Sequence, residues 1–339
     1  MSKWKDHIQF IRKLTIRKVW NGAKVYGSFH WSRLTKRTYH PGMPVSMSFE
    51  PTTACNLGCP ECPSGLKQFT RPTGNLKPAD FSKWMEELSP YLTYINFYFQ
   101  GEPFIHPRLL EMVKQASDAG VYTATSTNAH FINDSTAEKI IQSGLDRLII
   151  SIDGTTQEVY EQYRVHGELS KVIEGSKKLV EWKKKLGSTT PHLIFQFLVV
   201  KPNEHQMKDV QHLAQEIGVD EVRFKSAQVY DYKNGNPLIP EGSQYSRYHQ
   251  KQDGTYVLKN KMDNHCWRMW TSCVATWDGK IVPCCFDKDA QHTMGDLQST
   301  SFAAIWNSAS YRQFRASLFK SRKEIDICAN CSEGTQVWV

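Results

Sequence analysis

The sequence predicts an α/β fold in which parallel strands and helices alternate and close, or partly close, into a barrel. Between residues 45 and 225, six short segments rich in β-branched and aromatic residues alternate with five segments of helical periodicity. The chain has 339 residues, 40% of them hydrophobic, which is enough to bury a sizeable core. In such folds the chemistry lies beyond the carboxyl ends of the strands.

Each predicted element is bounded by turn residues. The strands are Val45 to Phe49, Tyr94 to Phe99, Tyr122 to Thr125, Arg147 to Ile152, Leu193 to Val199 and Glu221 to Lys225. The helices are Pro78 to Leu88, Pro107 to Ala119, Asp134 to Ser143, Glu168 to Leu186 and Gln206 to Ile217. We expect Asp134 to cap its helix, and left-handed glycines to follow four helices at Gly120, Gly144, Gly187 and Gly218.

Residues 1–44 form a basic N-terminal arm. They contain six lysines and four arginines against the single acid Asp6, so the rest of the chain is close to neutral although the whole carries +8. Several apolar residues in the arm approach helical spacing: Trp4, Ile8, Phe10, Ile11 and Leu14. The arm is expected to pack on the main domain with a solvated basic face, or to contact a peripheral membrane surface or an acidic partner.

After residue 225 the alternating pattern ends. Residues 226–263 are polar and tyrosine-rich, and are longer than an unstructured connection should be, so we expect a linker, or alternatively a lid over a site. Residues 264–339 form a small cysteine-dense module of the size that a metal stabilises. The domain boundaries are therefore expected near residues 44, 225 and 263.

The nine cysteines fall into two groups, three between Cys55 and Cys62 and six between Cys266 and Cys331. No apolar run is long enough for a membrane span and no signal core is present, which places the protein in the cytoplasm. Thiols stay reduced in that compartment, so clustered cysteines indicate metal or redox chemistry rather than disulfides. Two metal sites are implied.

The strongest motif is Cys55-Asn-Leu-Gly-Cys59-Pro-Glu-Cys62, directly after the first predicted strand. Three thiolates can hold a four-iron cluster (4Fe-4S) and leave one iron open to a ligand. A structural zinc would need a fourth ligand from elsewhere in the fold. A second motif, Gln100-Gly101-Glu102-Pro103, follows the second strand, and Gly101 allows a close backbone approach there.

These two motifs resemble those of the radical S-adenosylmethionine (radical SAM) enzymes, which carry Cys-x3-Cys-x2-Cys after the first strand of a partial (βα)6 TIM-like barrel. The resemblance covers about Val45 to Lys225 and implies that Cys55, Cys59 and Cys62 hold the SAM-binding 4Fe-4S cluster. It also implies that the segment around Gly101 and Glu102 receives the methionyl ammonium through backbone carbonyls and the carboxylate.

Further strand ends fit the same resemblance. Ser126 and Asn128, at the third strand, match the family's ribose-binding position, or form a loop-capping network. Ser151 ends the fourth strand and Arg164 follows it, and residues so placed hold the methionyl carboxylate in similar enzymes, a task that suits a guanidinium. An ordinary surface salt bridge is the alternative for Arg164.

The C-terminal cysteines resemble the auxiliary-cluster extension called SPASM, or its shorter form called twitch. The resemblance implies one auxiliary 4Fe-4S cluster, with ligands that we assign to Cys266, Cys284, Cys328 and Cys331. Cys285 competes with Cys284, and Cys273 is expected to be a spare, buried thiol. Four cysteines in two pairs would also suit zinc.

The resemblance implies reductive cleavage of SAM to a 5′-deoxyadenosyl radical, which abstracts a hydrogen atom from a small-molecule or peptide substrate. An external electron donor of flavodoxin or ferredoxin type starts the reaction, and the auxiliary cluster assists an oxidation or a bond-forming modification. Two alternatives remain open. One is modification of an RNA nucleotide through the basic arm, and the other is a catalytically silent, zinc-scaffolded binding protein.

Overall fold

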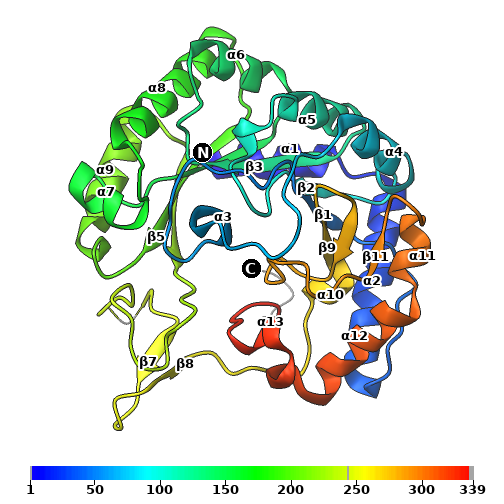
Figure 1. Cartoon of the computed structure of the whole chain (residues 1–339). Helices are drawn as coiled ribbons and strands as arrows, with labels where there is room; N and C mark the ends of the chain where they lie inside the picture. The colour runs from blue at the N-terminus through cyan, green and yellow to red at the C-terminus, as the bar shows by residue number, and fades with distance from the viewer. Residues whose placement is uncertain (1, 243, 336–339) are drawn as a thin grey trace.

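The computed structural model describes residues 2–242 and 244–335 and is organised around one nine-stranded sheet (Figure 1). Its strand order is β11-β10-β9-β1-β2-β3-β4-β5-β6. Strands β1 to β6 are parallel, with Ser46 beside Tyr94 and Tyr94 beside Tyr122. They span Ser46–Phe49, Tyr94–Asn96, Tyr122–Thr127, Arg147–Ser151, His192–Val199 and Glu221–Ser226. All six predicted strands are therefore present, and β2 is shorter than expected.

The helices between these strands are α3 (Pro63–Leu66), α4 (Pro78–Leu88), α5 (Leu109–Asp118), α6 (Asp134–Gln142), α7 (Gln157–Tyr163), α8 (Leu169–Lys185) and α9 (Met207–Ile217), with short 3₁₀ turns η1 (Pro103–Ile105) and η2 (Glu204–Gln206). Helices α4 to α9 form the outer arc in Figure 1, and the short α3 lies near the centre of the view. The five predicted helices are confirmed. All four glycines expected after helices have positive φ, from 61° to 91°.

The predicted cap of α6 is wrong by one residue. Asn133 has extended backbone angles, and its side chain accepts a hydrogen bond from the Thr136 amide at 2.9 Å, so Asn133 is the cap. The Asp134 carboxylate instead accepts a hydrogen bond from the Trp182 indole at 2.9 Å. Both residue types suit a cap, and the tertiary contact with α8 decides between them.

The N-terminal arm folds into two helices, α1 (Ser2–Arg12) and α2 (Ile16–Thr35), that pack on the barrel. Asp6 pairs with Arg147 and accepts a hydrogen bond from the Tyr122 hydroxyl, while Lys13 donates to Asp146 at 2.8 Å. The arm is therefore docked at the amino ends of β3 and β4, as the packed-helix alternative expected.

The C-terminal residues complete the sheet. Strand β9 (Ser272–Ala275) runs parallel to β1, and β10 (Lys280–Val282) and β11 (Gly295–Asp296) continue antiparallel. The surrounding helices are α10 (Arg268–Thr271), α11 (Phe302–Trp306), α12 (Ala309–Ser321), η3 (Arg322–Glu324) and α13 (Asp326–Ala329). The core of the barrel thus extends without a break into this part of the chain.

Residues 226–263 contain a two-stranded hairpin, β7 (Tyr248–Gln250) and β8 (Tyr256–Leu258). Val229, Leu238 and Tyr248 of this segment are buried in one apolar cluster with Leu57 and Cys59. The segment therefore packs directly against the cysteine loop that follows β1.

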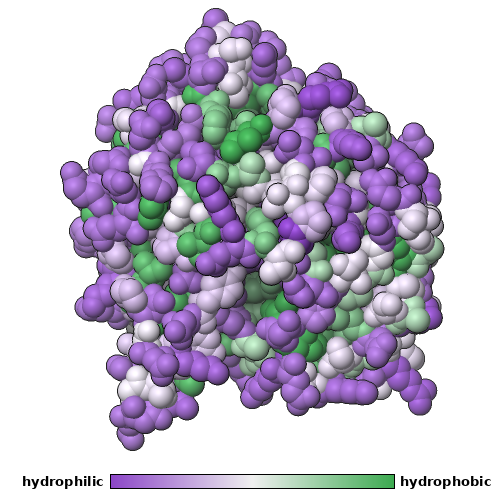
Figure 2. Space-filling view, viewed as in Figure 1, coloured by the Kyte–Doolittle hydropathy of each residue, from purple (hydrophilic) through white to green (hydrophobic). Residues whose placement is uncertain are grey.

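Figure 2 shows the same face as a surface, with hydrophobic residues gathered toward its centre and hydrophilic residues over most of the periphery. Among the described residues, no helix is both long enough and apolar enough to cross a membrane.

Candidate active site

The loop after β1 carries Cys55, Cys59 and Cys62 at the carboxyl edge of the sheet. Its last turn closes through a hydrogen bond from the Cys62 amide to the Cys59 carbonyl at 3.2 Å, and α3 begins at once. The three thiols border a cavity of about 230 Å³. All nine residues that the sequence assigned to the first cluster and to SAM line this cavity: Cys55, Cys59, Cys62, Gly101, Glu102, Ser126, Asn128, Ser151 and Arg164.

Gly101 brings the end of β2 against this loop. Its φ is +75°, and a Cβ added there would lie 2.3 Å from the Thr52 carbonyl oxygen and 2.8 Å from that of Ala54. The Gly101 amide donates to the Ser64 hydroxyl at 2.8 Å, and the Glu102 amide donates to the Ala54 carbonyl at 2.7 Å. Only glycine suits both the angle and the space, so the close approach expected from the sequence is present.

Glu102 is the buried acid of the cavity. One carboxylate oxygen accepts hydrogen bonds from the Thr127 hydroxyl at 2.7 Å and the Phe104 amide at 3.2 Å, and the other accepts from the Asn128 amide at 2.7 Å. Burial disfavours the charged form and raises the pKa of Glu102 to about 7, although these donors oppose the shift. Thr127 and Asn128 at the end of β3 therefore hold the Glu102 carboxylate in place.

Arg164 lies inside the site rather than on the surface. Its Nε pairs at 2.5 Å with the fully buried carboxylate of Asp153, and its Nη1 lies 3.8 Å from the Cys59 sulfur. Asp153 also accepts a hydrogen bond from the Leu198 amide at 2.6 Å. Asp153 was not predicted from the sequence, although its position directly after β4, two residues beyond Ser151, was the available signal.

The C-terminal cysteines gather around a second, smaller hollow. The four predicted auxiliary ligands border it together: Cys266, Cys284, Cys328 and Cys331. Apolar side chains of Met269, Phe314, Leu318 and Ile327 form most of the remaining wall. Cys273 is buried in the main core, away from this hollow.

Arg322 is the buried cation of this second site, which Arg268 also borders, and it was not identified from the sequence. Its side chain is almost completely buried. Its Nη2 donates to the Cys331 sulfur at 3.1 Å, and its Nη1 donates to the His265 carbonyl at 3.2 Å. Burial raises the pKa of the Cys266, Cys328 and Cys331 thiols, and the Arg322 guanidinium beside them opposes that shift toward the ionised form that a metal requires.

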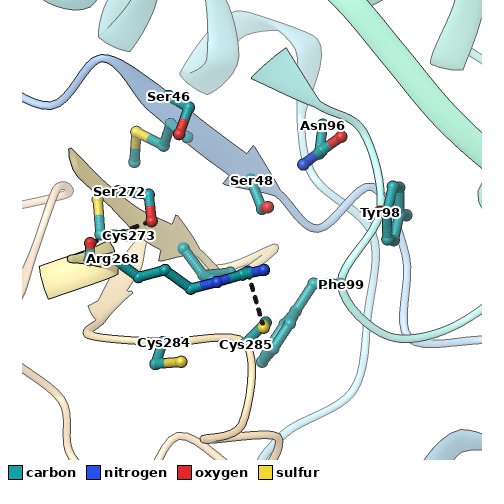
Figure 3. A pocket seen from close by; sticks show the side chains of 12 residues that line it. Ser46, Ser48, Asn96, Tyr98, Phe99, Arg268, Ser272, Cys273, Cys284 and Cys285 are labelled. Atoms are coloured by element: carbon teal, nitrogen blue, oxygen red, sulfur yellow. Dashed lines mark hydrogen bonds between the residues drawn. The ribbon is translucent and has the colours of Figure 1, made fainter. Parts of the chain in front are cut away.

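A third cavity, of about 140 Å³, lies between the two cysteine sites (Figure 3). It shares Tyr98 and Phe99 with the first cavity and Cys284 and Arg268 with the second. Cys285 borders only this cavity, where its sulfur faces the Arg268 guanidinium at 4.0 Å. We call it the central chamber.

The central chamber is polar on its barrel side. Ser46 and Ser48 of β1, Asn96 of β2 and Ser272 of β9 project into it. The Asn96 side-chain oxygen is buried and has no hydrogen-bond partner among the described residues. A ligand with a donor group would satisfy this oxygen.

The residues present fit iron–sulfur clusters. Each site offers several thiols with a buried arginine against one sulfur, and thiolates are the ligands of such clusters. No described group of three or more His, Cys, Asp or Glu side chains lies close enough to hold a single metal ion. All nine cysteines are free thiols in the structure.

Two family models match the chain. Residues 49–214 match the radical SAM superfamily, and residues 266–332 match SPASM, an iron–sulfur cluster-binding domain. The first match contains the cysteine loop and Arg164, and the second contains all four predicted auxiliary ligands. The match to an iron–sulfur domain does not support the zinc-scaffold alternative.

Two curated relatives align over most of the chain. A tungsten-containing aldehyde ferredoxin oxidoreductase cofactor-modifying protein of Pyrococcus furiosus is 25% identical, covering 78% of this chain and 82% of its own. A PqqA peptide cyclase of Bradyrhizobium diazoefficiens is also 25% identical, covering 84% and 78%. The solved structure of Streptococcus suis SuiB bound to S-adenosylmethionine is similar in fold, with a TM-score of 0.60, 14% identity, and coverage of 87% and 73%.

Proposed function

Because the chain belongs to the radical SAM enzymes with a C-terminal SPASM domain, which bind a 4Fe-4S cluster, SAM and an auxiliary iron–sulfur cluster, we propose that it modifies a polar substrate held in the central chamber. The reaction is removal of a hydrogen atom followed by oxidation or bond formation. The observation that carries the proposal is the chamber itself, which touches the SAM cavity at Tyr98 and Phe99 and the auxiliary site at Cys284.

In this proposal the chain's residues divide into three groups. Cys55, Cys59 and Cys62 hold the first cluster, and the other residues that line the same cavity hold SAM. Together these groups supply a 5′-deoxyadenosyl radical when an external donor of flavodoxin or ferredoxin type provides an electron. Cys266, Cys284, Cys328 and Cys331 hold one auxiliary 4Fe-4S cluster, whose contribution is to accept or relay an electron from the substrate.

The protein positions the cofactor through fixed polar groups. Glu102 and the carbonyls near Gly101 face the methionyl ammonium, and Arg164, aimed by Asp153, faces the methionyl carboxylate. Ser126, Asn128 and Ser151 contact the nucleoside and the amino-acid end. Because residues 226–263 cover the cysteine loop, they exclude water and oxidants from the site.

The substrate is proposed to present a hydrogen-bond donor to the Asn96 oxygen and polar groups to Ser48 and Ser272. The chamber of about 140 Å³ admits a side chain or a small ring, and its residues Ser46, Asn96, Arg268 and Ser272 also border a larger cavity of about 950 Å³. A peptide side chain or a small polar molecule is therefore the substrate class. The name of the PqqA peptide cyclase relative supports the peptide branch. Free thiols throughout the structure support a cytoplasmic location.

The test uses the full chain purified without oxygen. Two four-iron clusters predict about eight irons and eight sulfides per chain and no zinc. Mixing the reduced protein with SAM is expected to yield 5′-deoxyadenosine and methionine. Cys59→Ala is expected to abolish this cleavage and to remove about half of the iron, whereas Cys273→Ala keeps the full iron content. A Cys59→Ala protein that still cleaves SAM would refute the assigned site.

A second measurement tests the chamber. Asn96→Leu and Ser48→Val remove the polar groups and leave the cysteine loops untouched. Both variants are expected to keep uncoupled SAM cleavage while losing substrate turnover and deuterium transfer from labelled substrate to 5′-deoxyadenosine. If turnover persists in both, the substrate binds elsewhere.

A further inference from the structure

The outer face of helix α2 exposes large apolar side chains to solvent. Among the described residues, thirteen large hydrophobic side chains are prominently exposed, and nine of them lie between residues 4 and 39. Six belong to α2 itself: Ile16, Val19, Trp20, Tyr26, Trp31 and Leu34. Ile16 is 91% exposed and Leu34 is 82% exposed. Single exposed apolar residues are ordinary, but a run of this length on one helix indicates a contact surface.

These residues share one side of the helix because their spacing follows its turn. Ile16, Trp20, Trp31 and Leu34 follow one another at intervals of 4, 11 and 3 residues, which at about 100° per residue places them in one stripe. The opposite side contains the residues that the barrel and α10 bury: Lys18, Asn21, Val25, Ser28, Phe29 and Ser32. Helix α2 therefore has two apolar-containing faces. The inner one is buried, whereas the outer one stays largely exposed among the described residues, with ring contacts from Trp31 to Tyr39 and from Tyr26 to Trp267.

Basic side chains border the outer face on both sides. Arg17 and Lys24 lie along one edge of the stripe, and Arg33 lies along the other. None of the three is paired with a carboxylate within the described residues, in contrast to Lys13, which pairs with Asp146. The Lys24 ammonium lies over the Trp20 ring, 5.9 Å from its centre. The arm thus presents its uncompensated charge around an apolar centre.

We infer that the outer face of α2 is a peripheral membrane-docking surface, which binds an anionic lipid bilayer with the helix parallel to its plane. Tryptophan and tyrosine rings favour the headgroup region, where one part of the ring is apolar and another is wet. Lysine and arginine stems cover apolar surface while their charged ends reach phosphate groups. Aliphatic residues such as Ile16 and Leu34 enter the acyl boundary, as in other interfacial helices.

The positive charge of the N-terminal arm favours binding to an anionic bilayer over association with a second copy of this chain. Residues 1–44 carry nine net positive charges, and a symmetric pairing through α2 would bring two such surfaces together. Like charges at an interface oppose association, whereas an anionic leaflet attracts the exposed cations that border the stripe, Arg17, Lys24 and Arg33. The stripe is also a convex helix surface with cations on two sides, a geometry that suits a flat anionic plane.

The inference is independent of the proposed enzymatic reaction, and it is tested by flotation of the full iron-loaded chain with lipid vesicles. The chain is expected to float with vesicles of phosphatidylglycerol and phosphatidylcholine, and to remain in the soluble fraction with pure phosphatidylcholine. High salt should weaken the binding because it screens the basic residues. Absence of flotation with the anionic vesicles, or equal flotation with both kinds, overturns the inference.

Two double variants of α2 separate the apolar from the electrostatic contribution. Trp20→Ser with Trp31→Ser, and Lys24→Glu with Arg33→Glu, are each expected to reduce vesicle partitioning at least about tenfold. Lys177→Glu with Lys184→Glu makes the same change in net charge on the exposed side of α8 and serves as the matched control. Unchanged circular dichroism and iron content show that each variant is folded.

The control variant distinguishes a specific face from general charge. It is expected to bind vesicles like the parent chain, and an equal loss in the α8 variant would overturn the assignment to α2. Sedimentation velocity tests the competing occupant, a second copy. If the parent chain is a dimer that Trp20→Ser with Trp31→Ser converts to a monomer, the outer face is a protein interface and the membrane inference fails.

Discussion

The two cysteine sites of this chain differ in the surroundings of their sulfur atoms. We call the site of Cys55, Cys59 and Cys62 the open site and the C-terminal one the closed site. The site after β1 opens onto a cavity of about 230 Å³ lined by the polar groups of Glu102, Ser126 and Asn128. The C-terminal site is enclosed by apolar side chains such as Met269 and Leu318. An incompletely ligated cluster needs room and polar partners for its ligand, while a fully ligated one needs neither.

Each site also has one buried arginine against a cysteine sulfur, but the two cations are balanced differently. Arg164 is paired with the buried carboxylate of Asp153, while Arg322 contacts thiols and backbone carbonyls and no carboxylate within the described residues. The Asp153 carboxylate fixes the orientation of the Arg164 guanidinium and keeps it charged, which suits the proposed contact with the methionyl carboxylate. Arg322 has no carboxylate partner among the described residues, so its positive charge faces the sulfurs of Cys266, Cys328 and Cys331.

The largest expected effect is a loss of iron that distinguishes Cys284 from its neighbour Cys285 as a ligand in the closed site. Cys284→Ala should remove the auxiliary cluster and with it about half of the iron, because Cys284 borders the hollow with Cys266, Cys328 and Cys331. Cys285→Ala should keep the full iron content, since Cys285 borders only the central chamber. Iron analysis and Mössbauer spectra of both variants check this. If Cys285→Ala loses iron and Cys284→Ala keeps it, the ligand is Cys285 and not Cys284.

The next effect concerns the open site and uses two glycines of similar conformation. Gly101→Ala forces a Cβ to within 2.3 Å of the Thr52 carbonyl at a φ of +75°, so SAM affinity should fall by more than about a hundredfold. Gly120 has a φ of +72° and open space around it. Gly120→Ala is the matched control and should cost only about 1 kcal/mol of unfolding free energy, with SAM affinity unchanged in equilibrium dialysis.

The sequence predicted the cysteine loop of the first site because its chemistry is local, and the resemblance to SPASM supplied the cysteines of the second site. The spacing of Cys55, Cys59 and Cys62 lies within one loop, and the strand ends at Gly101 and Ser151 follow from the alternation of strands and helices. Parallel strands bring such ends to one edge, so the residues assembled around one cavity as expected. The ligand roles themselves remain predictions, and the iron analyses above test them.

The supporting residues could not be predicted in the same way. Arg322 reaches the closed site only because α12 and η3 fold back over it, and the Asn133 cap prevailed because Asp134 contacts Trp182 on another helix. The full length of α2 was not predicted either. Apolar residues of its inner and outer sides alternate along the sequence, so no single helical period stands out. In each case a contact distant in sequence decides the structure.

A smaller loss of SAM affinity should follow when the negative charge that pairs with Arg164 is removed. Asp153→Asn removes the acid that aims the guanidinium, so SAM affinity should fall about thirtyfold, the equivalent of about 2 kcal/mol for a hydrogen bond to a charged group. Asp146→Asn is the matched control, because it breaks the Lys13 pair at the opposite ends of the strands. Both variants should lower the melting temperature, and only Asp153→Asn should change SAM affinity. Equal SAM affinity in the two variants would assign Asp153 a purely structural role.

The smallest expected effect is a pH dependence of SAM affinity that arises from Glu102 in the open site. Burial raises the pKa of Glu102 from its usual value of 4.5 to about 7. The raised pKa means that the contribution of Glu102 to stability is complete below about pH 4.5 and is lost as the pH rises through about 7. Binding of the SAM ammonium has the opposite sign, because it requires the ionised carboxylate.

SAM affinity is therefore expected to increase about tenfold between about pH 6 and pH 8, as the ionised fraction of Glu102 rises. The melting temperature of the SAM-free chain should fall over the same interval. Calorimetric titrations of the parent chain and of Glu102→Gln give the contribution of this one group, since the variant binds SAM weakly but without the added pH dependence. A parent chain whose SAM affinity follows the variant's pH profile would show that the acid is already ionised at pH 6 and that Thr127 and Asn128 outweigh its burial.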